Sequence, residues 1–125
     1  MEARTIARLY GAGRVGLGAT LLIAPRPLGL FWLGRAGGSP AGSVALRALG
    51  ARDLVLGAIS LHTLDHPEVA PRWQRACAAV DAVDLVATAA VRPALPPVGS
   101  AIVMAMAAAG AAVGAALGSA LGRDA

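Results

Sequence analysis

Charged and aromatic residues are both scarce in this sequence of 125 residues, and lysine does not occur at all. Only 14% of the residues are charged and 3% are aromatic, whereas soluble domains carry about 25% charged residues. A soluble core would have to be built from Ala, Val, Leu and Gly, which bury little apolar area per residue. With 57% hydrophobic residues, the composition instead predicts a single integral membrane domain over residues 1–125.

Basic runs, cysteine pairs and catalytic signatures are also lacking. The arginines stand singly in apolar segments, so the net charge of +4 favours anionic lipid headgroups as partners, and we expect no nucleic-acid partner. Cys77 is the single cysteine and excludes an internal disulfide. The spacing of His62 and His66 resembles that of a metal site on one face of a helix. A proline turn breaks that helix face, so we expect no metal and no cofactor.

What the sequence does contain is long apolar segments separated by prolines. Residues 93–122 carry no charge, and the part from about residue 98 is long enough to cross ~30 Å of hydrocarbon. Three further segments of similar length end at proline-containing turns. We therefore predict an all-α fold, an up-and-down bundle of four transmembrane helices. The predicted helices cover about residues 3–24, 43–64, 71–91 and 98–122.

Aromatic residues and arginines give the expected placement in the bilayer. Residues 28–33, with Phe31 and Trp32, are typical of a short interfacial segment, and Trp73 begins the third helix at the other face. The distribution of arginines favours a multi-pass protein of the cell membrane with a cytoplasmic N-terminus. Arg4, Arg8, Arg72, Arg75 and Arg123 would lie on the cytoplasmic side, and Arg26, Arg35 and Arg92 on the other.

Ionisable residues inside the predicted helices are the most informative feature. Each one costs about 2.5–3.5 kcal/mol near the centre of a span, so we expect them to face one another or water. Three arginines and three aspartates balance formally, as a self-neutralising buried network requires. These residues are Arg14 in the first helix, Arg47, Arg52 and Asp53 in the second, and Asp81 and Asp84 in the third.

Helical spacing indicates which of these groups share a face. A polar stripe on the third helix contains Gln74, Cys77, Asp81, Asp84 and Thr88. Tyr10 lies one turn before Arg14 on the face of the first helix that we expect to meet this stripe. On the second helix Arg47 and Asp53 share one side, whereas Arg52 points nearly opposite and must snorkel, pair elsewhere or meet a second protomer.

Glycines at four-residue spacing form the most regular pattern of the fourth helix. Gly110, Gly114, Gly118 and Gly122 predict a smooth ridge that another helix can approach closely. The ridge serves either packing within the chain or an interface between copies in a homo-oligomer.

Two short segments carry a resemblance. The stretch from Gly50 to Gly57 has the pattern Gly-x-Arg-Asp-Leu-x-Leu-Gly, and residues 81–84 follow the pattern Asp-x-x-Asp. Together they resemble small bacterial four-helix membrane proteins classed as a domain of unknown function. The resemblance covers most of the chain and implies the fold, but no chemistry.

The leading hypothesis is a non-enzymatic multi-pass membrane protein whose Arg and Asp network holds the bundle and binds a small polar or lipid ligand. One alternative is a membrane-embedded enzyme for a lipidic or isoprenoid substrate, with Asp81 or Asp84 as general acid or base. Another is a component of a small proton-coupled transporter. The sequence leaves open whether the network is structural or functional.

Overall fold

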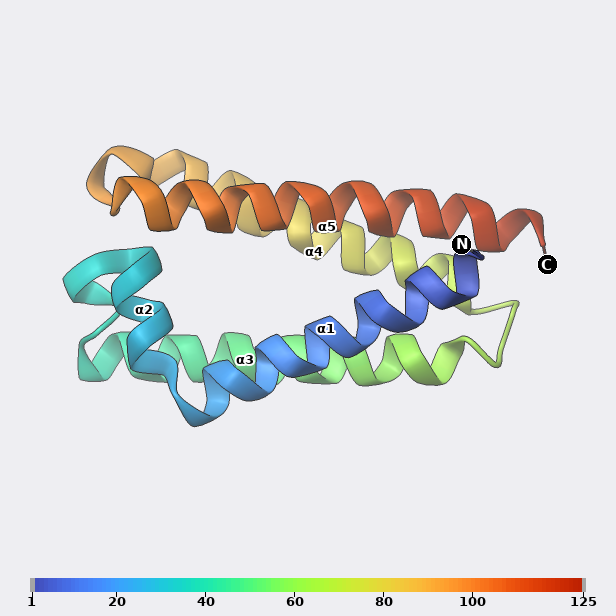
Figure 1. Cartoon of the computed structure of the whole chain (residues 1–125), viewed down its shortest axis with the longest axis horizontal. Coiled ribbons are helices and arrows are strands. Elements are labelled where there is room, and N and C mark those ends of the chain that lie inside the picture. The colour runs from blue at the N-terminus through green and yellow to red at the C-terminus, as the bar shows by residue number, and fades with distance from the viewer. Residues whose placement is uncertain (1, 125) are drawn as a thin grey trace.

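The computed structural model describes residues 2–124, and these residues form an all-helical chain without strands (Figure 1). Four helices are long and one is short. Two 3-10 turns, Gly34–Ala36 and Arg92–Ala94, complete the structure. The five α-helices are α1 (Ala3–Ile23), α2 (Pro25–Leu33), α3 (Pro40–Thr63), α4 (Ala70–Val91) and α5 (Pro97–Arg123).

Prolines define where most of these helices begin. Pro25, Pro40, Pro71 and Pro97 lie in the first turns of α2, α3, α4 and α5, where the missing N–H group has no helical partner to lose. Ser39 caps α3, because its Oγ accepts a hydrogen bond from the Gly42 N–H at 3.0 Å.

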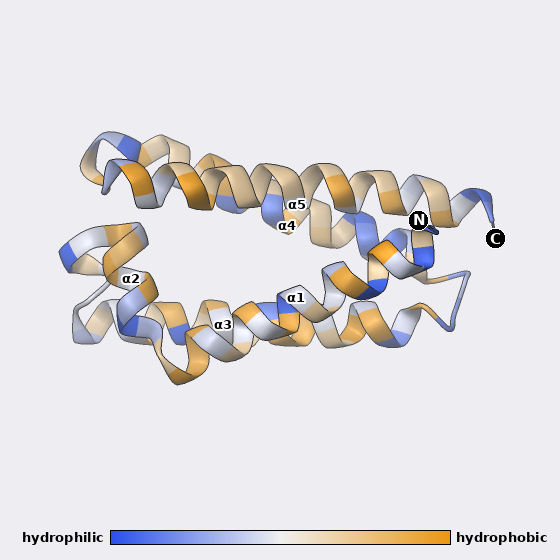
Figure 2. Cartoon of the chain, viewed as in Figure 1, coloured by the Kyte–Doolittle hydropathy of each residue, from blue (hydrophilic) through white to orange (hydrophobic). Residues whose placement is uncertain are grey.

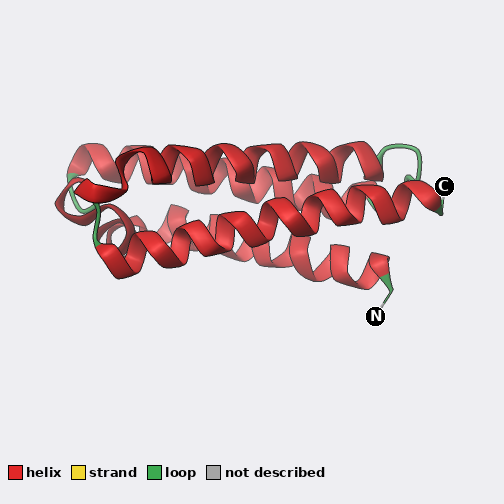
Figure 3. Cartoon of the chain, turned by 90° about the horizontal axis from the view of Figure 1, so that it is seen from above, coloured by secondary structure: helices red, strands yellow, loops and turns green. Residues whose placement is uncertain are grey.

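The long helices form two pairs. α1 packs along α3, and α4 packs along α5, while contacts between the two pairs are sparser. Figures 1 and 3 show the two pairs lying over one another, with α2 at one end and both chain termini near the other end. The short α2 contacts α3 and α5 and so links the pairs at its end of the molecule.

Glycines allow the backbones within each pair to approach closely. A Cβ atom added to Gly18 would lie 2.5 Å from the Gly50 carbonyl oxygen, and one added to Gly57 would lie 2.7 Å from the Gly11 oxygen. The Gly110, Gly114 and Gly118 positions of α5 face α4 in the same way, whereas Gly122 has ordinary spacing to its neighbours. The predicted ridge thus packs against α4 within one chain, and an interface between copies would need another face of α5.

The all-helical prediction is confirmed, and each predicted long helix matches an observed one within three residues at either end. The segment before residue 34 differs, because it forms the separate helix α2. Its axis is bent by 100° from α1. The sequence predicts only that the first helix ends at a proline-containing turn, but Pro25 of that turn also begins the next helix.

Only α5 is by itself long and apolar enough to cross a membrane among residues 2–124, with a mean hydropathy of 2.0 over its best 18-residue window. α1 reaches that level only when taken together with residues 25–36. α3 and α4 do not reach it because each carries several charged residues, and most of these charges lie on the inner face.

Hydrophobic residues occur along all four long helices (Figure 2), and several large ones are exposed while some charged residues are buried. Large apolar side chains are exposed on each long helix, as shown by Leu9 at 62%, Val44 at 70%, Val83 at 65% and Val98 at 66%. The buried residues include Arg14, Asp53, Gln74 and Asp81. Soluble proteins rarely bury so many ionisable groups while exposing apolar ones.

A charged cluster beside an apolar cavity

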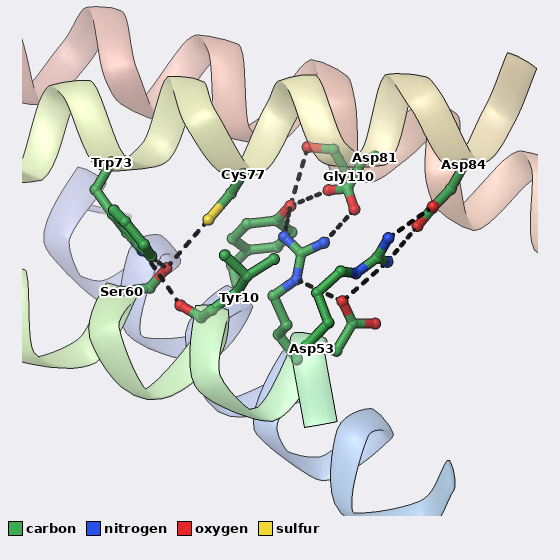
Figure 4. A network of polar contacts seen from close by, with 11 residues as sticks. Tyr10, Asp53, Ser60, Trp73, Cys77, Asp81, Asp84 and Gly110 are labelled. Atoms are coloured by element: carbon green, nitrogen blue, oxygen red, sulfur yellow. Dashed lines mark hydrogen bonds and ion pairs between the residues drawn. The ribbon is translucent and has the colours of Figure 1, made fainter. Parts of the chain in front are cut away.

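A cluster of charged side chains that includes Asp53, Asp81 and Asp84 lies between the helix pairs (Figure 4). Arg14 is at its centre. Its Nη2 pairs with Asp81 Oδ1 on α4, and its Nε lies 3.6 Å from Asp53 Oδ1 on α3. All three residues are buried. Because Arg14 is on α1, one side chain connects three helices.

Tyr10 extends this cluster to α5. Its hydroxyl donates to Asp81 Oδ2, lies 3.2 Å from the Gly110 carbonyl oxygen, and accepts from Arg14 Nη1 at 3.3 Å. The absence of a side chain at Gly110 makes room for this arrangement, because an added Cβ would lie 2.5 Å from Asp81 Oδ2. The cluster therefore touches all four long helices.

Arg52, for which the sequence left three options, pairs within its own chain. Its Nη1 and Nη2 donate to the two oxygens of Asp84 at 3.0 and 2.6 Å, a bidentate arrangement that favours Arg over Lys. Its Nη2 also lies 3.2 Å from Asp53 Oδ1. Asp53 is thus shared by Arg14 and Arg52.

Arg47, which we expected in the network, lies outside it. Its Nε donates to the Leu22 carbonyl oxygen at 3.1 Å and its Nη1 donates to Ser43 Oγ at 2.9 Å, on the exposed surface. Carbonyl groups in the last turn of a helix lack helical partners, so the end of α1 is a good acceptor site for Arg47. The cluster therefore contains two arginines and three aspartates, and the expected formal balance of three and three is wrong.

A second group of polar contacts lies beside the first. Trp73 Nε1 donates to Ser60 Oγ at 3.0 Å and lies 3.2 Å from the Leu56 carbonyl oxygen, and Ser60 Oγ is 3.5 Å from Cys77 Sγ (Figure 4). The sequence predicted Trp73 at a membrane boundary and did not single out Ser60. These contacts also run from α3 to α4, that is, from one helix pair to the other.

Gln74 is on the predicted buried face of α4, but it takes no part in the charged cluster. The residue has no exposed surface, and neither its amide oxygen nor its amide nitrogen has a hydrogen-bond partner among residues 2–124. A buried amide without partners is unfavourable by about 1–3 kcal/mol.

A cavity of about 470 Å³ lies against the charged cluster. Its charged wall is formed by Arg14, Asp53, Asp81 and Asp84. The other walls are apolar, and several of their residues, including Leu9, Ile102 and Met106, are also exposed on the outside. The cavity therefore opens between α1 and α5. The apolar lining consists mainly of Leu9, Leu17, Leu21, Leu28, Phe31, Trp32, Leu49, Ile102, Val103 and Met106.

The sequence did not predict this cavity, because it arises from the spacing between two helix pairs and from the direction of α2. Phe31 and Trp32 drew attention only as interfacial aromatics, yet both line the cavity. A signal was present in Gly13, a small residue on the same side of α1 as Tyr10 and Leu17. Its position leaves open space where a side chain would otherwise lie.

The three aspartates of the cluster differ in how many of their oxygens accept hydrogen bonds. Both oxygens of Asp81 and both oxygens of Asp84 are engaged by Tyr10, Arg14 or Arg52. Each oxygen of these two carboxylates thus already accepts a hydrogen bond, whereas Asp53 Oδ2 has no donor among residues 2–124. In the same part of the chain, no three His, Cys, Asp or Glu side chains converge as a group that could hold a metal ion.

Comparison of this chain with protein-family models, curated proteins and solved structures finds no match.

Proposed function

We propose that this protein is a non-enzymatic integral membrane protein of the cell membrane, whose four long helices span the bilayer and whose cavity binds an amphiphilic molecule. The observation that carries the proposal is the cavity of about 470 Å³, which has apolar walls and ends on the Arg and Asp cluster. An amphiphile matches this combination, since its apolar body suits the walls and its polar head suits the charged end.

The distribution of side chains supports the membrane part of the proposal. α1, α3 and α4 are too polar on average to stand out as spans, but their charged residues near the helix centres point inward. Lipid would then meet mainly the exposed Val, Leu and Ala side chains, and the charged groups would stay in contact with one another.

A structural role for the polar contacts is compatible with ligand binding. Direct packing between the two helix pairs is sparse, whereas Arg14, Tyr10, Arg52 and Trp73 each form polar contacts across the gap between the pairs. In a bilayer, where apolar surfaces gain little by leaving lipid, such contacts hold helices together. The same bridges hold the two pairs apart along one side and so keep the cavity open.

The shape of the cavity supports a ligand that enters from the lipid phase. Its volume is within the usual range for small-molecule sites. Its opening between α1 and α5 is bordered by apolar residues that the bilayer would surround. An amphiphile could therefore move sideways into the site without crossing water.

Two substitutions of open glycines on α1 test this function. Neither Gly13 nor Gly16 has a neighbouring atom within 4 Å of an added Cβ, but only Gly13 lines the cavity. We expect Gly13→Leu to fill part of the opening and Gly16→Leu to leave it unchanged, while both variants fold. The measurement is native mass spectrometry of protein extracted in mild detergent, which detects a bound lipid or metabolite by its added mass.

The expected result is a bound molecule in the wild type and in Gly16→Leu, and its loss in Gly13→Leu. The proposal would be overturned if the wild type carried no molecule and none of a series of added amphiphiles bound. Recovery of the protein in the soluble fraction of cells, without detergent, would overturn the membrane part.

A further inference from the structure

The charged cluster does not balance its own charge. Arg14 and Arg52 contribute two positive charges, whereas Asp53, Asp81 and Asp84 contribute three negative charges when ionised. The difference is one negative charge, since Arg47 is bound elsewhere. An uncompensated charge in low-dielectric surroundings is unfavourable, so a site of this kind favours a partner of opposite charge.

Among the carboxylate oxygens of the cluster, one atom lacks a hydrogen-bond donor, while the buried Arg52 Nε is a donor without an acceptor among residues 2–124. Asp53 Oδ1 contacts both arginines, but Asp53 Oδ2 has no donor among residues 2–124. The side chain of Asp53 is 8% exposed, and the residue lines the cavity. Oδ2 is therefore not fully buried, and it belongs to a residue of the cavity wall. In Figure 4 the second oxygen of Asp53 has no contact line.

The arginines offer less to a ligand than the aspartates do. The Nη atoms of Arg14 donate to Asp81 and Tyr10, and those of Arg52 donate to Asp84 and Asp53. Arg52 does not line the cavity, whereas all three aspartates do. The surface that faces a ligand is therefore more negative than the cluster as a whole, and an anionic head would meet carboxylates before free guanidinium groups.

We propose that the cavity selects an amphiphile with a single positive charge, an alkyl amine or alkylammonium compound, whose head contacts Asp53 Oδ2 and whose chain lies along the apolar walls. This inference rests on the proposed function and specifies the ligand class. A primary ammonium head supplies the donor that Oδ2 lacks and neutralises the remaining charge. The aliphatic part of such a molecule fits the Leu, Val and Met lining.

Probes that share one chain and differ in the head group test this proposal. The binding of octylamine, octanol and octanoate to purified protein in maltoside micelles is measured by isothermal titration calorimetry near neutral pH. We expect octylamine, as its ammonium ion, to bind at least about tenfold more tightly than octanol, and octanoate to bind most weakly. A short-chain phosphatidylethanolamine serves as a fourth probe, because its ammonium group is accompanied by a phosphate that cancels the net charge. We expect it to bind more weakly than octylamine.

Two variants locate the preference. Asp53→Asn keeps the shape but removes the charge, so octylamine should lose its advantage over octanol while octanol binding persists. Asp84→Asn removes the excess negative charge without changing Asp53, and it should also reduce the preference for octylamine over octanol. Asp65→Asn is the control, because Asp65 is exposed and pairs only with Arg4 among residues 2–124. This control should bind all four probes as the wild type does.

The outcomes separate the two proposals. Equal binding of the three octyl probes, tighter binding of octanoate, or tighter binding of the phospholipid would overturn the charge selectivity and leave the ligand-binding function standing. A preference for octylamine that survives in both Asp53→Asn and Asp84→Asn would also overturn it. Failure of every probe to bind would overturn the proposed function itself.

Discussion

Arg14 is the residue whose contacts reach the largest number of helices. It pairs with Asp81 on α4, approaches Asp53 on α3, and donates to Tyr10 on its own helix, which in turn lies against Gly110 of α5. A buried charge that loses its partner is left without solvation, which is more damaging than the loss of an exposed ion pair. One guanidinium group thus takes part in a set of contacts that reaches all four long helices.

Replacement of Arg14 with Gln should therefore destabilise the protein by about 3–5 kcal/mol, because buried Asp81 loses its only arginine and buried Asp53 loses one of its two. Arg47→Gln is the matched control, since Arg47 makes exposed contacts only, and it should cost about 0–1 kcal/mol. Equilibrium unfolding in mixed detergent and sodium dodecyl sulfate measures both. Equal losses for the two variants would show that Arg14 does not hold the cluster together.

Replacement of Gln74, in contrast, should stabilise the protein. Its amide is buried without hydrogen-bond partners, so replacement with Met, a residue of similar length without polar atoms to satisfy, should stabilise the protein by about 1–3 kcal/mol. The same unfolding assay detects this gain. Destabilisation by Gln74→Met would mean that the amide has a partner in the membrane, such as a bound water molecule.

Helical spacing in the sequence correctly predicted that most of these polar residues face inward. It could not identify the residues with which they form hydrogen bonds or ion pairs. Arg47 and Arg52 illustrate the limit. The angular positions around α3 predicted that Arg47 faces the cluster and that Arg52 faces away. In the structure, however, Arg52 pairs with Asp84, and Arg47 donates a hydrogen bond to the Leu22 carbonyl oxygen. Which partner each arginine contacts depends on the axial offset between helices and on the length of its side chain. Neither can be predicted from the spacing of residues along one helix.

At the level of the elements, glycine spacing determines how closely the helices of a pair approach. Gly11 and Gly18 on α1 lie against Gly57 and Gly50 on α3, and the glycines of α5 face α4. The sequence predicted such a ridge for α5, but the matching positions on α1 and α3 could be recognised only once the two helices were seen to pair. The position of α2 was equally inaccessible, because the sharp bend at Ala24 and Pro25 sets its direction.

Alanine substitutions distinguish the glycines in contact from those that are open. Gly57→Ala places a methyl group 2.7 Å from the Gly11 oxygen and 2.8 Å from the Val15 nitrogen, so we expect a loss of about 1–3 kcal/mol from overpacking. Gly16→Ala meets nothing within 4 Å and should be neutral or gain up to about 1 kcal/mol through helix propensity. Thermal unfolding in detergent compares the two. Similar melting temperatures for both variants would show that α1 and α3 do not approach as closely as these distances require.

At the scale of the whole molecule, four long helices that each cross the bilayer once would leave both termini on one side. Both termini lie near the same end of the structure, with α2 near the other end (Figure 1). The turn between α3 and α4, residues 64–69, belongs to the end with the termini, and the α2 region and residues 92–96 belong to the opposite end. With four spans as proposed, the distribution of arginines predicts that the end with the termini lies in the cytoplasm.

Cysteine labelling in intact cells tests this orientation directly. Cys77 is buried, so a Cys77→Ser background removes the native thiol, and Ser39→Cys or Glu68→Cys then places one thiol at each end. A maleimide reagent that cannot cross membranes should label Ser39→Cys in intact cells and Glu68→Cys only after permeabilisation, because an even number of spans with a cytoplasmic N-terminus leaves residue 68 inside. The opposite pattern would invert the orientation while preserving four spans. Labelling of both positions without permeabilisation would place the two ends on the same side, which four crossings do not allow.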